Sequence, residues 1–132
     1  MSEKISVVFF ELGKKPELRT IERTLANMQE LVKGEAPYGI IQCLCPWDAP
    51  LALICHDEGK LFEMKPNRML IDEEGNLFDV VVGPCFICGS LPEEDNFSSI
   101  PEEYISSFMD DGKCRNMFPA FTGFLMGMLT ND

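Results

Sequence analysis

The sequence is poor in several residue types on which large classes of proteins depend. It has one histidine, one tryptophan and only eleven basic side chains against twenty-two acidic ones, which gives a net charge of −11. Direct binding to nucleic acid requires Lys and Arg to neutralise phosphates, so this charge argues against it. No apolar run approaches the ~20 residues that a membrane span needs. A glycine-rich phosphate loop is also missing.

The first ten residues, MSEKISVVFF, do not read as an export signal. They contain an early acidic residue and no apolar segment followed by a small-residue cleavage site. We therefore expect a cytoplasmic protein that does not contact a membrane and whose six cysteines are reduced thiols. A length of 132 residues suits one domain, residues 1–132, with one hydrophobic core.

Hydrophobic patterning in the first part of the chain predicts a β-hairpin followed by a helix. Residues 3–22 are rich in β-branched and aromatic residues on both sides of a turn. Thr24 is the expected N-cap of the helix, and Gly34 is its expected C-terminal stop. In later turns, Gly59 and Gly75 are expected to adopt a positive φ.

The remaining apolar segments predict an α+β fold, in which one mixed or antiparallel sheet is covered by helices. Ser99 followed by Glu102 is a capping-box pattern, and Pro101 suits the first turn, so we expect a C-terminal helix that runs to about Asp110. From Arg115 on the pattern is ambiguous, with a short helix as one interpretation. Further strands are expected at residues 38–46, 51–56, 77–83 and 85–89.

Two segments match a known family. The first is a glycine, lysine, proline hairpin before a helix that ends in glycine, with matches at Gly13, Lys14, Pro16 and Gly34. The second is a longer pattern that matches at Glu58, Gly59, Lys60, Leu61, Pro66, Asn67, Arg68, Asp72, Gly75 and Asp79. Over residues 5–90 the chain resembles the domain of unknown function 3846 (DUF3846) family, small proteins of bacteria, their phages and other mobile elements. Lys65 and His56 depart from the pattern, and the resemblance implies no activity.

The stretch around Asn67 and Arg68 has two interpretations. In the structural one, Asn67 bonds to the backbone and Arg68 forms an ion pair with Asp72 or Asp79, which fixes a corner of the fold. In the functional one, Lys60, Asn67 and Arg68 together bind an anionic or carbonyl-bearing ligand.

The cysteine spacing raises the possibility of a structural zinc ion. Cys43-x-Cys45 places two thiols on one face of a strand, and Cys85-x-x-Cys88 has a spacing that is common in zinc sites. If these segments are neighbours, four thiolates converge. The alternative is buried thiols without a cofactor, because residues 85 and 88 of a straight strand point to opposite faces.

An enzyme is the least favoured class. His56 is the only histidine, and it cannot pair directly with Cys55, because adjacent residues of a strand face opposite ways. No nucleophile, base and orienting group can be assembled from the sequence. We therefore expect a protein without catalytic residues.

Acidic residues accumulate before the apolar C-terminal segment, residues 117–130. Residues 93–111 contain no Lys or Arg and seven acids: Glu93, Glu94, Asp95, Glu102, Glu103, Asp110 and Asp111. One interpretation is a solvated helix, with the apolar segment completing the core. The other is a surface that binds a basic protein partner, beside an apolar patch that forms an interface, for example in a homodimer.

Two functional hypotheses follow. The first is a non-enzymatic accessory protein of phage or mobile-element type that acts by protein–protein contact, for instance as an acidic inhibitor of a nucleic-acid-processing system. The second is a module that binds a small ligand or a structural zinc ion.

Overall fold

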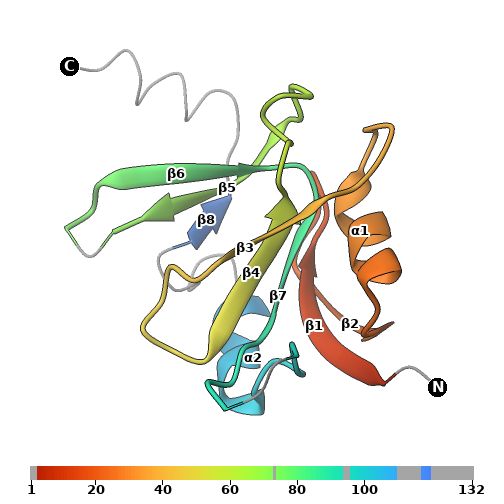
Figure 1. Ribbon diagram of the computed structural model, residues 1–132. Coiled ribbons are helices and arrows are strands. Elements are labelled where there is room, and N and C mark those ends of the chain that lie inside the picture. Colours follow the sequence, from red (N-terminus) through yellow and green to blue (C-terminus); the bar gives the residue numbers. More distant parts are fainter. Residues whose placement is uncertain (1–2, 73, 94–95, 110–116, 120–132) are drawn as a thin grey trace.

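The computed structural model describes residues 3–72, 74–93, 96–109 and 117–119. In this part of the chain the strands form two antiparallel sheets, and two helices pack beside them (Figure 1). The predicted α+β class is confirmed, although the strands lie in two sheets rather than one. None of the helices in the described ranges is both long and apolar enough to span a membrane.

The larger sheet has the strand order β2-β1-β7-β4-β3. Its strands are β1 (Lys4–Phe10), β2 (Glu17–Glu22), β3 (Ile41–Leu44), β4 (Leu51–His56) and β7 (Cys85–Gly89). The smaller sheet has the order β6-β5-β8. Its strands are β5 (Pro66–Ile71), β6 (Leu77–Val82) and β8 (Met117–Pro119). The helices are α1 (Leu25–Lys33) and α2 (Glu102–Met109).

The larger sheet is covered on both faces, which gives the molecule two apolar layers. Alternate residues of β1 face opposite ways, so that Val7 and Phe9 join Met28 and Val32 of α1 in one cluster. Side chains of β1, β4 and β7 on the other face pack against the smaller sheet and α2. The members of this second cluster from outside the larger sheet are Leu70, Val81, Ile100, Phe108 and Met117.

The helix α1 begins and ends where the sequence predicts. The Thr24 hydroxyl accepts a hydrogen bond from the Asn27 amide at 3.1 Å, and Gly34 follows the last turn with a φ of 57°. A close approach follows the helix, because a Cβ on Gly39 would overlap the carbonyl oxygen of Gln29. Only glycine therefore lets the segment before β3 pass directly against α1.

The predicted capping box of the second helix is wrong. The Ser99 hydroxyl accepts from the Ser6 amide of β1 at 2.9 Å, and the Ile100 amide donates to the Ser6 carbonyl at 2.8 Å. Ser99 therefore ties the segment before the helix to the larger sheet. The helix itself starts later, at Glu102, after Pro101.

Two further expectations about local backbone need correction. Gly75 has the predicted positive φ, at 86°, but Gly59 does not. Gly59 is required for space instead, since an added Cβ would lie 2.8 Å from a Val82 methyl carbon. In the ambiguous C-terminal region, residues 117–119 form a strand rather than a helix, and Met117 is fully buried.

The sequence did not predict β5, although it is the central strand of the smaller sheet. It starts with Pro66 and Asn67, which have low strand propensity, followed by the charged Arg68. Pro is tolerated at the first position of a strand, because no ladder hydrogen bond is needed there. Pairing with β6 on one side and β8 on the other decides the conformation of this segment.

Candidate functional site

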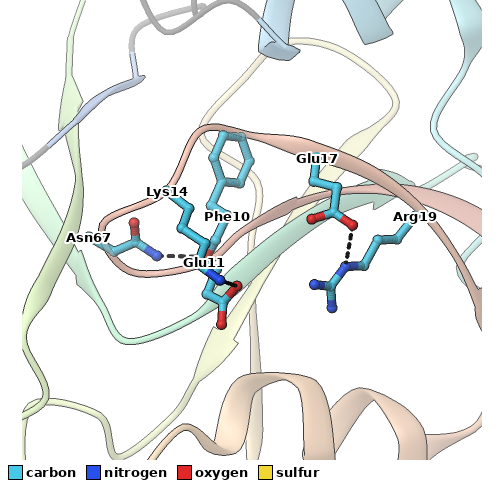
Figure 2. Close-up of polar contacts among 6 residues, drawn as sticks. All are labelled: Phe10, Glu11, Lys14, Glu17, Arg19 and Asn67. Atoms are coloured by element: carbon cyan, nitrogen blue, oxygen red, sulfur yellow. Dashed lines mark hydrogen bonds and ion pairs between the residues drawn. The ribbon is translucent and has the colours of Figure 1, made fainter.

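Asn67 lies at the start of β5 with 2 % of its surface exposed, and its side chain connects the two sheets. Its Nδ2 donates to the carbonyl of Phe10, at the end of β1, at 2.8 Å (Figure 2). The same nitrogen donates at 2.8 Å to the carbonyl of Gly83, between β6 and β7. Both amide hydrogens are therefore used to hold three chain segments together.

Arg68 is buried beside Asn67, with 3 % of its surface exposed. Its Nη1 donates to the backbone oxygen and to the side-chain Oδ1 of Asn67, both at 2.9 Å. Its guanidinium carbon lies 4.7 Å from the centre of the Phe10 ring, which is a favourable cation–π geometry. Asn67 and Arg68 thus form one buried polar unit at the junction of the sheets.

The carboxylates that were expected to pair with Arg68 have other partners. Asp72 Oδ1 accepts from the backbone amides of Glu74 and Asn76, at 2.9 and 2.8 Å, and so shapes the β5–β6 turn. Asp79 Oδ1 lies 2.7 Å from the Nζ of Lys60. Of the three residues proposed to bind a ligand, only Lys60 is on the surface; the other two are built into the fold.

Lys60 lines a cavity of about 240 Å³ between the larger sheet and β6. Its walls carry both polar and apolar side chains: Gln42, Leu44, Cys55, His56, Asp57, Lys60, Asp79, Val80, Val81 and Val82. Burial, together with the charges of Asp79 and Asp57, raises the pKa of the Cys55 thiol to about 12. The Cys55 thiol is therefore protonated at neutral pH.

His56 is held in one orientation by its two ring nitrogens. Nε2 lies 2.8 Å from the Tyr38 carbonyl oxygen, and Nδ1 lies 3.0 Å from the Glu58 amide nitrogen. Because the Glu58 amide can only donate, Nδ1 is the acceptor and Nε2 carries the hydrogen of a neutral imidazole. Both nitrogens are bonded within the fold, so His56 fixes the segment after β4.

Tyr38 and Glu58 form a surface pair beside this histidine that the sequence did not indicate. The Tyr38 hydroxyl donates to Glu58 Oε1 at 2.7 Å. This hydrogen bond, together with desolvation and the negative charge of Glu58, raises the pKa of Tyr38. Twenty positions separate the two residues in the sequence, so no local pattern could have revealed the contact.

The structure does not bring the four candidate zinc ligands together. Cys85 lies in the apolar cluster on one face of β7, and Cys88 lies in the cluster on the opposite face. Burial raises the pKa of both thiols, that of Cys88 to about 12. Within the described residues, no three His, Cys, Asp or Glu side chains are placed to hold a metal ion.

Cys43 and Cys45, in contrast, are exposed and adjacent. Their sulfur atoms lie 3.9 Å apart at the end of the outer strand β3. Partial burial and the neighbouring Cys45 raise the pKa of Cys43 to about 11, so that the Cys43 thiol keeps its proton at neutral pH.

The candidate partner surface is described only in part. Glu93, Glu102 and Glu103 are exposed, the last two in the first turn of α2. Glu94, Asp110 and Asp111 lie outside the described residues.

Charge is strongly asymmetric along the chain. Residues 1–68 contain ten acidic and nine basic side chains, whereas residues 69–132 contain twelve acidic and two basic ones. In the described part of the chain, the ion pairs of the first half join Glu3 to Arg23, Glu11 to Lys14 and Glu17 to Arg19. Nearly all of the net negative charge therefore belongs to the second half.

These features define a class: an α+β protein with two packed antiparallel sheets that are joined by a buried Asn–Arg unit. The family model of the domain of unknown function DUF3846 matches residues 5–113. The protein therefore belongs to this family, and the match extends beyond the resemblance over residues 5–90 to include α2. No curated protein and no solved structure matches the chain.

Proposed function

We propose that this protein is a non-enzymatic accessory protein that acts by binding a basic protein partner through its acidic second half. The observation that carries the proposal is the charge distribution, with twelve acidic and two basic side chains in residues 69–132. An excess of exposed carboxylates attracts a partner of opposite charge, accelerates association and disfavours acidic partners.

The polar side chains that most resemble a ligand site are hydrogen-bonded within the fold, and this supports the proposal. Asn67, Arg68 and His56 are buried and bonded within the fold. Exposed carboxylates such as Glu93, Glu102 and Glu103 are available to a partner. The proposal therefore assigns recognition to these exposed carboxylates.

The partner class follows from the same charge. Proteins that handle nucleic acid present Lys and Arg in the geometry of a phosphate backbone. A dense set of carboxylates can occupy such a surface in place of the nucleic acid. We therefore propose, as the biological setting, a mobile element or its host in which this protein inhibits a nucleic-acid-processing system.

Two variants of equal charge test the proposal. Glu93→Gln/Glu102→Gln/Glu103→Gln neutralises three exposed carboxylates of the second half, and Glu22→Gln/Glu30→Gln/Glu35→Gln neutralises three exposed carboxylates of the first half. Both variants change the net charge from −11 to −8. Each is immobilised and compared with the natural protein in capturing proteins from a nuclease-treated lysate of a bacterial host.

We expect a basic protein to bind the natural chain and the first-half variant, and to be lost from the second-half variant. High salt should release it, and duplex DNA should compete with its binding. Equal loss in both variants would show that only net charge matters. A partner that is retained by both variants and is insensitive to salt would contradict the proposal.

A second candidate is binding of a small molecule in the 240 Å³ cavity beside Lys60. The observation that favours it is the mixture of polar and apolar side chains in the cavity walls. Native mass spectrometry of freshly purified protein should then show an excess over the sequence mass. The excess should disappear in Lys60→Ala, whereas a bare mass in the natural protein would rule out a tightly retained ligand.

A further inference from the structure

Two exposed thiols lie side by side at the end of the outer strand β3. Cys43 belongs to the strand and Cys45 follows its last residue, Leu44. Their sulfur atoms are 3.9 Å apart. Since alternate residues of an extended segment point to the same side, the C-x-C spacing accounts for this proximity.

The separation of the two sulfur atoms is close to that of two thiolates on one metal ion. With metal–sulfur bonds of ~2.3 Å, two sulfur ligands lie about 3.8 Å apart at a tetrahedral centre and about 4.6 Å apart across a linear one. A disulfide fits less well: residues two apart in extended backbone have Cα atoms ~6.7 Å apart. That distance is at the upper end of the range that disulfides allow.

The number of ligands selects the metal. Zinc in structural sites takes four protein ligands, and no three metal-binding side chains converge in the described residues. Copper(I) is a soft ion that prefers thiolates. Two of them complete a linear coordination when the exposed side chains turn and the sulfur atoms move about 0.7 Å further apart than the 3.9 Å of the free protein.

We propose that Cys43 and Cys45 form a two-thiolate site for copper(I). Binding forms two Cu–S bonds and releases the two thiol protons. Copper remains in the +1 state, so the step needs no oxidant or reductant. The site uses no residue of the acidic second half, because Cys43 and Cys45 both lie within residues 1–68.

Anaerobic competition with a chromophoric copper(I) chelator, bicinchoninate, tests the site on the full, reduced chain. The natural protein should withdraw one copper(I) per chain from the chelator. Cys43→Ser/Cys45→Ser should lower the affinity more than about 100-fold, since loss of an outer-shell partner alone costs 10–100-fold. Cys114→Ser, outside the described residues, is the matched control and should behave like the natural chain.

Two further measurements separate loss of ligands from loss of fold. Circular dichroism should be unchanged in the double variant, because both cysteines are exposed. X-ray absorption of the copper-loaded natural protein should show two sulfur neighbours. Copper binding that survives in the double variant, or that is lost in Cys114→Ser, would overturn the proposal. So would failure of the natural chain to compete with the chelator. A copper centre with more than two sulfur ligands would also overturn it.

Discussion

Asn67 shows how one buried amide can join two sheets. Its Nδ2 bonds to Phe10 and Gly83, and its Oδ1 accepts from Arg68. Asn67→Ala leaves buried polar groups without these bonds, and we expect the free energy of unfolding to fall by about 3 kcal/mol. Urea denaturation measures the change.

The matched control for this prediction is Asn76→Ala, at an exposed position where the hydrogen bonds to Asp72 come from the backbone. We expect it to change stability by less than about 0.5 kcal/mol. Similar unfolding midpoints for the two variants would show that the Asn67 amide does not hold the sheets together.

The hydrogen bond between Tyr38 and Glu58 predicts a pH-dependent change in the stability of the fold. Ionising Tyr38 removes its hydrogen bond to Glu58 and sets two negative charges side by side, so the pKa of Tyr38 is raised. The pKa of Tyr38 is higher in the folded state than in the unfolded state. The stabilisation that this hydrogen bond gives is therefore complete below the unfolded pKa, and it is lost as the pH rises through the folded pKa. In alkaline spectrophotometric titration, Glu58→Gln should move one tyrosine to lower pH, and an unmoved tyrosine would contradict the contact.

For single residues, the sequence indicated which side chains are important but not which atoms they contact. Asn67 and Arg68 are a polar pair that precedes an apolar run. This pattern fits both a corner of the fold and a ligand site. Their partners, Phe10 and Gly83, are 57 and 16 residues away from Asn67. Only the pairing of strands brings these atoms together, so local patterns could not decide between the two interpretations.

At the level of secondary-structure elements, the close approach of the segment around Gly39 to α1 gives a specific prediction. In Gly39→Ala the new Cβ would meet backbone atoms of Gln29, which cannot rotate away. We expect a loss of about 3 kcal/mol, because relief requires the helix to shift on its apolar cluster. Thermal or urea unfolding measures this loss.

Gly75→Ala is the control for that substitution. Gly75 has a positive φ, but no atom of the described residues lies within 4 Å of an added Cβ, so only a backbone cost of about 1 kcal/mol is expected. A larger loss for Gly75→Ala than for Gly39→Ala would mean that backbone conformation, rather than the close approach, limits these positions.

Local signals predicted the elements that depend on local physics. Thr24 and Gly34 delimit α1, and residues 51–56 form a strand with the predicted bounds. The sequence failed where a distant segment decides the outcome. Ser99 bonds to Ser6 of β1 instead of capping a helix, and β5 becomes a strand between β6 and β8 despite its polar start.

For the whole molecule, the charge asymmetry predicts an unusual response to salt. The Debye length falls from ~30 Å at 0.01 M to ~8 Å at 0.15 M ionic strength, which screens repulsion among the acids of the second half. We expect the thermal midpoint to rise by about 2–4 °C over this range. Calorimetry at both salt concentrations checks the rise.

Paired neutralisations identify the source of this effect. Glu74→Gln/Glu93→Gln should flatten the salt response, because both residues lie in the half with excess negative charge. Glu22→Gln/Glu30→Gln should leave more of the response in place. A midpoint that falls with salt would instead show that the ion pairs of the first half dominate.

The strand order also has a consequence for how the chain is made. On a ribosome, β1 and β2 can pair early, but β1 meets β7 only after Gly89 has emerged. The second neighbour of β5 is β8, at residues 117–119, which is the last of the described strands to be synthesised. One edge of β5 therefore stays unpaired while some 46 further residues are translated. A nascent chain that stalls after α2 exposes that edge to chaperones and to other nascent chains.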